Sequence, residues 1–153
     1  MPQPHVHIFY RIWFTWVDPI VIGCTVFGCI FTPNDALEML VPGPLPPVDA
    51  LQSALLHQAA ALFGFMGIMF GVLLRASSDP KIWRIVQAAT LAVDVSLIAT
   101  MFAGLEKQGR LDTAEWRGIE WLNLGFTVWV ALIRVGFLSN LGGQDERKVK
   151  KSV

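Results

Sequence analysis

Four apolar stretches recur along the chain, at residues 8–31, 51–74, 82–105 and 118–138, and each carries a few polar residues. A helix rises 1.5 Å per residue, so about 20 residues cross the ~30 Å hydrocarbon core of a bilayer. Each stretch reaches that length with only isolated charges inside it. The pattern therefore predicts an all-α protein, an integral membrane four-helix bundle.

The polar residues inside these stretches repeat at helical spacing. At about 100° per residue, those of one stretch gather on one side of its helix. A charge at the bilayer centre costs about 3 kcal/mol or more, so such residues normally face a bundle interior. We therefore expect an internal polar cavity. The residues are Arg11, Thr15, Asp18 and Thr25 in the first stretch, Gln87, Thr90 and Asp94 in the third, and Glu120, Asn123, Thr127 and Arg134 in the fourth.

The segments between the stretches divide the chain into a membrane domain at 1–140 and a basic tail at 141–153. Residues 32–50 contain five prolines and predict a stiff loop. Pro19 is expected to kink the first helix beside Asp18, because proline donates no hydrogen bond to the preceding turn. The second stretch has small residues at helical spacing, which allow a neighbouring helix to come close. These are Ala60, Gly64, Gly67 and Gly71.

Composition agrees with a lipid environment. The chain is 54% hydrophobic and 16% charged, whereas soluble domains average about 25% charged residues. Twelve basic and twelve acidic residues balance, so nothing indicates nucleic-acid binding. Cys24 and Cys29 lack C-x-x-C spacing and point in different directions on a helix, which predicts small packed side chains rather than a redox pair.

Lysine and arginine counts predict the orientation of the four spans. Eight of these residues lie on the side shared by both termini and three on the other, with Arg134 left aside, which places both termini in the cytosol. The last residues, Lys150-Lys151-Ser152-Val153, resemble the dilysine signal that returns membrane proteins to the endoplasmic reticulum. A chance basic tail is the alternative. We expect a multi-pass endoplasmic reticulum membrane protein.

Asp94 and Asp18 lie at comparable depth in their stretches and are the first candidates for chemistry. An ionised carboxylate in hydrocarbon is so costly that Asp94 is expected to keep its proton near neutral pH and to act as an acid. Its structural alternative is an interhelical hydrogen bond. Asp18 would be its partner in proton transfer. For Asp18 the alternatives are an ion pair with Arg134 or a hydrogen bond at the kink.

A second polar group is expected near the other membrane surface. His57 and Gln58 enter the second stretch at the level where Glu120 and Asn123 enter the fourth. A His–Glu pair there would serve as acid and base, so Glu120 is a third catalytic candidate. Contact with water at the membrane edge is the alternative, and we favour it for Glu120.

The long and aromatic side chains allow two interpretations. Arg134 lies four residues before the end of its stretch, where it would snorkel toward the cytosolic headgroups or bind substrate. Trp129 lies deeper and would line the cavity and stabilise a carbocation, or else pack against lipid. The remaining tryptophans are typical of interfacial anchors. They are Trp13, Trp16, Trp83, Trp116 and Trp121.

Several runs resemble a family of small fungal four-span proteins of unassigned function. The likeness covers about residues 8–140, and its members often accompany secondary-metabolite pathways, which implies a lipophilic intermediate as substrate. The runs are Tyr10-Arg11, Phe14-Thr15-Trp16-Val17-Asp18-Pro19, Leu74-Arg75-Ala76, Trp83-Arg84 with Asp94 after it, and Asn123-Leu124-Gly125-Phe126.

The architecture is also similar to the EXPERA superfamily of sterol isomerases and the sigma-2 receptor. That resemblance implies proton shuttling by a His and acidic residues, for which His57, Asp94 and Asn123 occupy comparable spans. The acidic residue expected one turn after the His is missing, because Ala61 stands there. Small fungal membrane terpene cyclases also use paired carboxylates, but those chains are longer and have more spans.

These observations favour an isomerase or terpene cyclase that acts on a terpenoid or sterol-like intermediate by carboxylate-mediated proton transfer. No cofactor or metal fingerprint is visible. The alternative is a non-catalytic lipid- or sterol-binding or scaffold protein, and a homodimer stays open. We expect Asp94 to be the acid, with Asp18 or Glu120 as its partner, and the substrate-binding candidates are His57, Gln58, Asn123, Thr90, Trp129 and Arg134.

Overall fold

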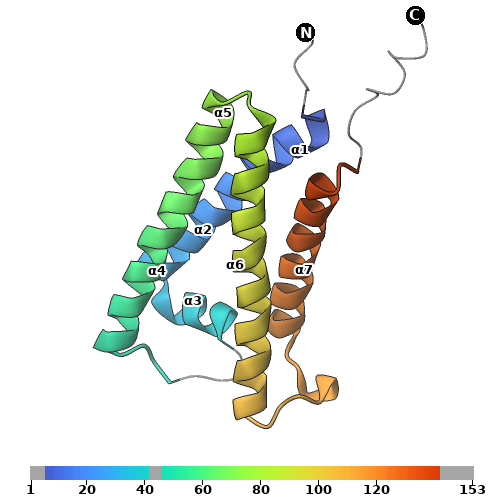
Figure 1. Cartoon of the computed structure of the whole chain (residues 1–153). Helices are drawn as coiled ribbons and strands as arrows, with labels where there is room; N and C mark the ends of the chain where they lie inside the picture. The colour runs from blue at the N-terminus through green and yellow to red at the C-terminus, as the bar shows by residue number, and fades with distance from the viewer. Residues whose placement is uncertain (1–5, 42–45, 142–153) are drawn as a thin grey trace, which may run out of the picture.

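A computed structural model describes residues 6–41 and 46–141. Four helical segments in it are long and apolar enough to cross a membrane, at Ile8–Phe31, Ala50–Ala76, Pro80–Lys107 and Gly118–Leu138. Their ends differ from the predicted ends by at most two residues. The described residues form no strand, so the all-α four-helix bundle is confirmed (Figure 1). The basic tail, with Lys150 and Lys151, lies outside the described residues.

Two of the four spans contain a short π-helical segment. The first span consists of α1 (Ile8–Ile12), the π-helical η1 (Trp13–Val17) and α2 (Asp18–Phe31). The second consists of α4 (Ala50–Ile68), the π-helical η2 (Met69–Leu73) and α5 (Leu74–Ala76). The third and fourth spans are uninterrupted, as α6 (Pro80–Lys107) and α7 (Gly118–Leu138).

The bundle is built from two helix pairs, with α2 packed along α4 and α6 packed along α7. The small residues of α4 allow the first of these contacts. A Cβ added at Gly67 would meet Ile22 Cγ2 at 3.4 Å, and one at Gly71 would meet Pro19 at 3.9 Å. The expected close approach is therefore present at Gly67 in α4 and at Gly71 in η2, whereas a Cβ added at Gly64 would meet nothing within 4 Å.

Arg75 stabilises the first span at its proline. Pro19 has no N–H, so it cannot donate the helical hydrogen bond to the carbonyl of Thr15 four residues earlier. The Arg75 Nη2 atom donates to that carbonyl at 2.5 Å, and its guanidinium lies 4.1 Å from the centre of the Trp16 ring. η1 and η2, which lie next to these residues, pack against each other. An orphaned backbone acceptor in the membrane is thus satisfied by the neighbouring span.

The segment at 32–50 contains a helix, so the predicted loop is wrong in part. The helix α3 (Pro33–Leu40) lies at the end of the bundle opposite the termini and packs against α2, α4 and α7 (Figure 1). Pro33 suits a first helical position, where no N–H is needed, and Asp35 adds an acidic group to the first turn. The prolines had pointed to a loop, although one of them starts a helix. We call this end of the bundle the α3 end.

The opposite end, which we call the termini end, is closed by a hydrophobic core. Each helix pair contributes large side chains to it, and they close the space between the pairs. Tyr10 Oη also donates to the Leu141 carbonyl at 2.8 Å, and Arg84 Nη2 donates to the Leu138 carbonyl at 2.9 Å. The buried core residues are Phe14, Phe70, Leu74, Trp83, Val86 and Ile133.

Two tryptophans predicted as interfacial anchors lie inside the protein instead. Trp83 is 3% exposed and donates from Nε1 to the Ser77 carbonyl at 2.9 Å. Trp116 is 9% exposed and donates to the Arg110 carbonyl at 3.1 Å. Each is buried because a nearby turn carbonyl accepts the indole N–H, which leaves the ring free to pack in a core.

Replacing Arg75 tests its role at the proline. We expect Arg75→Met to lower the free energy of unfolding by about 1–3 kcal/mol, because the Thr15 carbonyl is left unpaired. In a Pro19→Ala background the loss should be smaller, since the substituted residue supplies the backbone N–H that proline lacks. Denaturant unfolding in mixed micelles measures both effects, with Lys81→Met as the control for removing a cation at the same end. Equal losses in both backgrounds would contradict this account.

Candidate functional site

An arginine lies between two aspartates in the interior of the bundle. Arg134 on α7 donates from Nη1 to Asp94 Oδ2 on α6 and from Nη2 to Asp18 Oδ2 on α2, each at 2.9 Å. The exposed fractions of Arg134, Asp18 and Asp94 are 3%, 4% and 7%. The guanidinium also lies 5.8 Å from the centre of the Phe70 ring. We call these three ionisable residues the charge cluster, and it connects one helix pair to the other.

The direction of Arg134 follows from helix geometry. Side chains on a helix tilt toward its N-terminus, and α7 starts at the α3 end of the bundle and finishes at the termini end (Figure 1). Arg134 therefore reaches away from the nearer membrane surface and deeper into the bundle. The prediction that it snorkels to the headgroups is wrong, because two buried carboxylates bind its head.

The cation also changes the expectation for Asp94, which considered the carboxyl group in hydrocarbon without a partner, whereas Arg134 is paired with it. The ion pair of Asp18 with Arg134, one of the alternatives left open by the sequence, is present. Two carboxyl groups facing one guanidinium carry an excess negative charge, which is costly in hydrocarbon. The charge cluster becomes neutral when it holds one proton. Its composition therefore allows it to take up and release a single proton.

A cavity of about 520 Å³ extends from the charge cluster to α3, between the two helix pairs. That volume lies in the range of small-molecule sites, which are mainly apolar with a few polar groups. The polar lining comes from the charge cluster, Asn123 and Thr127, among others. The apolar lining includes Ile20, Val21, Ile22, Phe27, Phe63, Met66, Val93, Leu97, Phe126 and Val130.

The predicted site residues divide into two groups. Asp18, Asp94, Asn123 and Arg134 line this cavity, so the expectation that the two carboxyl groups face one interior cavity is confirmed. Thr25 and Thr127 line it as well.

Three buried polar residues of the predicted faces do not line the cavity. Thr90 is 6% exposed but is not a lining residue, and its hydroxyl donates back to the Val86 carbonyl at 2.9 Å. The hydroxyl of Thr15 is likewise turned to its own helix, and Gln87 is buried outside the lining.

Three predicted residues lie away from the cavity. His57 and Gln58 are exposed on α4, and Trp129 is 54% exposed on α7. Five residues separate Trp129 from Arg134, which turns it about 140° around the helix. These residues were predicted to lie in the site because of their depth in the membrane, but each lies on a helical face that points away from the cavity.

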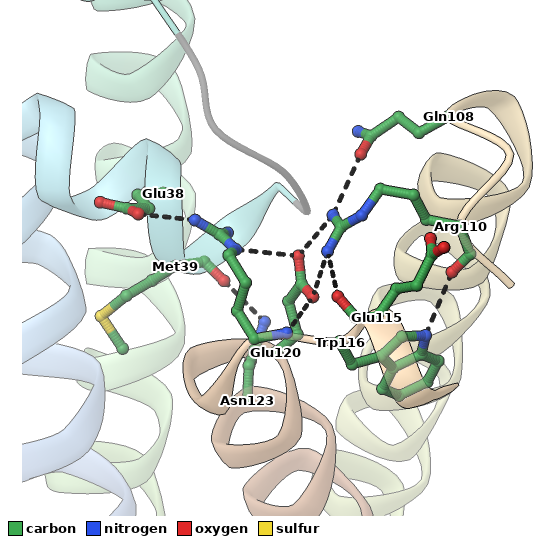
Figure 2. A network of polar contacts seen from close by, with 9 residues as sticks. Glu38, Met39, Gln108, Arg110, Glu115, Trp116, Glu120 and Asn123 are labelled. Carbon is green, nitrogen blue, oxygen red and sulfur yellow. Dashed lines mark hydrogen bonds and ion pairs between the residues drawn. The ribbon is translucent and has the colours of Figure 1, made fainter. Parts of the chain in front are cut away.

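Glu120 is buried at the start of α7 rather than exposed at the membrane edge. It is 3% exposed, and it accepts hydrogen bonds from Arg110 Nη1 at 2.9 Å and from the backbone N–H of Arg117 at 2.8 Å (Figure 2). The bond to the Arg117 backbone is that of a helix-capping glutamate. The hydrogen bond to Glu120 also raises the pKa of Arg110 above its usual range. Glu120 does not line the cavity, so its contacts indicate a structural role.

The same network holds α3 over the end of the cavity. Arg117 Nη1 donates to Glu38 Oε1 at 2.6 Å, and Asn123 Nδ2 donates to the Met39 carbonyl at 2.7 Å (Figure 2). The sequence interpretation missed Glu38 because it assigned residues 32–50 to a loop. The Pro33 start and the ALEML run after it were the available signal.

Within the described ranges, no three His, Cys, Asp or Glu side chains come together as a metal site would require. Cys24 and Cys29 are free thiols, the first exposed and the second buried.

The fold and the site define a multi-pass membrane protein with a charge cluster and a cavity between two helix pairs. Residues 4–144 match a family described as a domain of unknown function, DUF7704, and the chain belongs to that family. No curated protein and no solved structure matches the chain.

Removing the central cation tests the energetics of the charge cluster. Arg134→Met leaves two buried carboxyl groups without their partner, so we expect a loss of about 3–5 kcal/mol in unfolding free energy. Adding Asp18→Asn and Asp94→Asn to that variant should recover most of the loss, because no charge is then buried. Denaturant unfolding measures both, with the exposed Arg11→Met as the control. Wild-type stability of Arg134→Met would show that the ion pairs do not hold the helix pairs together.

Proposed function

We propose that this protein is a membrane-embedded, cofactor-independent isomerase or cyclase that acts on a terpenoid or sterol-like molecule by proton transfer. One observation carries the proposal: the apolar cavity ends at a buried cluster of two carboxyl groups and one guanidinium. Neither an apolar cavity nor a buried ion pair alone would indicate this chemistry.

The cavity supports a lipophilic substrate. Its wall is mainly aliphatic and aromatic, and its polar groups are confined to a few positions. Such a site favours a hydrocarbon skeleton that places its reactive or polar end next to the charge cluster. Phe27, Phe63 and Phe126 also line the cavity, and aromatic faces stabilise cationic intermediates.

The charge cluster supports an exchange of one proton. In the proposed reaction, the Asp94 carboxyl gives its proton to one carbon of a double bond, which leaves a carbocation on the neighbouring carbon. A ring closure or migration follows, and a C–H next to the cationic carbon gives its proton to the Asp18 carboxylate. The charge cluster finishes with the number of protons with which it began. Arg134 keeps both carboxyl groups in place and compensates the negative charge.

Arg134 also favours a second candidate function. Arg134 bonds to both carboxyl groups and joins the helix pairs, so the only role of the charge cluster could be to hold the helices together. The cavity would then bind a lipid or sterol without chemistry, or the protein would act as a scaffold. Stability and turnover of the same variants separate these functions.

The cellular location is part of the proposal. The excess of Lys and Arg on the side of both termini favours termini in the cytosol, and the Lys150-Lys151 pair favours the endoplasmic reticulum membrane.

Amidation of Asp94 tests the proposed acid. We expect Asp94→Asn to stay folded and to lose product formation, because an amide cannot supply the proton. Asp94→Glu should keep partial activity only if the cavity admits one more methylene. Microsomes with and without the chain, supplied with terpenoid or polyketide-derived precursors, provide the assay, and Glu106→Gln is a control at an exposed carboxylate.

The outcomes of that assay distinguish the candidates. Full turnover by Asp94→Asn would rule out Asp94 as the acid. Binding of the precursors by the wild-type protein without turnover would favour the lipid-binding function. Loss of folding in Asp94→Asn with no binding by the wild-type protein would favour the scaffold.

A topology experiment checks the orientation. Single cysteines introduced at positions 108 and 78, placed in a Cys24→Ser/Cys29→Ala background, should label from opposite sides of sealed microsomes. We expect a membrane-impermeant maleimide added outside, on the cytosolic face, to reach position 78 and not position 108, because positive charge marks the cytosolic side. Labelling of position 108 alone would reverse the assignment.

A further inference from the structure

Four of the five buried side-chain polar atoms without a hydrogen-bond partner in the described residues belong to Gln87, Arg134 and Trp13, and the fifth is Arg117 Nη2 at the α3 end. Gln87 is 0% exposed, and neither its Nε2 nor its Oε1 atom has a hydrogen-bond partner. The Nε atom of Arg134 is buried and unpartnered as well. The indole N–H of Trp13 lies near the Asp18 carboxyl but outside hydrogen-bond geometry.

The atoms of Gln87, Arg134 and Trp13 all lie toward the termini end. Gln87 precedes Asp94 by two helical turns on the same face of α6, and Trp13 precedes Asp18 by five residues. Arg84 on α6 donates to the Leu138 carbonyl at the end of α7, which aligns these two antiparallel helices. In this alignment the backbone of Arg134 lies near the level of Gln87. The cavity lies on the opposite side of the charge cluster, and Gln87 and Trp13 do not line it.

An unpartnered buried polar atom costs about 1–3 kcal/mol, and such atoms are nearly always paired with protein or with ordered water. The hydrophobic core of Phe14, Phe70 and Trp83 closes the termini end, so a lipid chain does not reach this position. The partner must therefore be small. It must also accept from three N–H donors and donate to the Gln87 carbonyl oxygen. An anion that carries no proton cannot donate, and the nearby carboxyl groups would repel any anion.

We infer that ordered water binds between Gln87, Arg134 and Trp13, on the termini side of the charge cluster. A water molecule both donates and accepts, and buried waters typically make about three hydrogen bonds to otherwise unpaired groups. Because one water accepts at most two hydrogen bonds, two such molecules are needed to accept from the three donors and to donate to the Gln87 carbonyl oxygen.

This water site deepens the proposed function, and its role in proton transfer rests on that function. Water next to the Asp18 carboxyl and the Arg134 guanidinium gives the charge cluster a neighbour that can accept or donate a proton inside the closed termini end. The lipophilic substrate reaches the charge cluster from the cavity side. Water and substrate therefore contact the charge cluster from opposite sides, and neither displaces the other.

The test uses the full chain in lipid nanodiscs with isotope-labelled arginine. The Nε–H signal of Arg134, assigned by its absence in Arg134→Lys, should show magnetisation exchange with water. In Gln87→Leu, which keeps the side-chain volume and removes the amide, that exchange should be lost. Gln58→Leu is the matched control at an exposed position and should leave the exchange unchanged.

Trp13→Phe provides a second variant if Gln87→Leu does not fold, and it should weaken the same exchange by removing the indole donor. Absence of water exchange at Arg134 Nε–H in the wild-type protein would overturn the inference. Exchange that persists unchanged in the folded variants would also overturn it. Neither readout depends on turnover, so full activity of Asp94→Asn would contradict the proposed function and leave the water site in place.

Discussion

The structure depends on the exclusion of unbalanced charge from hydrocarbon. Asp18 and Asp94 come from different helix pairs, and Arg134 is the cation that both of them bind. Each carboxyl group alone would be costly at its depth, and the guanidinium alone would be equally so. Joining the three groups reduces the excess charge to one, which a single proton removes, and fixes the spacing of α2, α6 and α7. At the two ends of the bundle, apolar side chains pack between helices whose separation is fixed in this way.

The same arrangement explains why a cavity exists at all. Helices α2 and α4 contact closely through small residues, and α6 runs along α7, but the two pairs are held apart by the long Arg134 side chain. The space between them is filled near the termini by large side chains and is covered by α3 at the other end. The ion pairs that join the two helix pairs across this gap therefore leave a cavity, and the charge cluster lines it.

Sequence alone identified the spans and the polar faces, because both follow from hydrophobicity and helical period along one segment. Asp18 and Asp94 were placed correctly for that reason. The pairing of Asp18 with Arg134 could only be left as an alternative, since it depends on how separate helices pack. Trp129 and His57 were misplaced because depth was weighed above helical face. Glu120 was misjudged because its partner Arg110 lies in a connecting segment. Helix α3 was missed because the five prolines of residues 32–50, of which only Pro33 lies in the helix, indicated a loop.

The position of Arg134 on the fourth span has a consequence for biosynthesis. A chain emerging from the ribosome delivers Asp18 and Asp94 to the membrane before the residue that neutralises them exists. Until α7 is inserted, the first three spans carry two acidic groups with no internal counter-ion. A chain that stops before α7 therefore keeps both carboxyl groups without the cation that binds them in the complete fold.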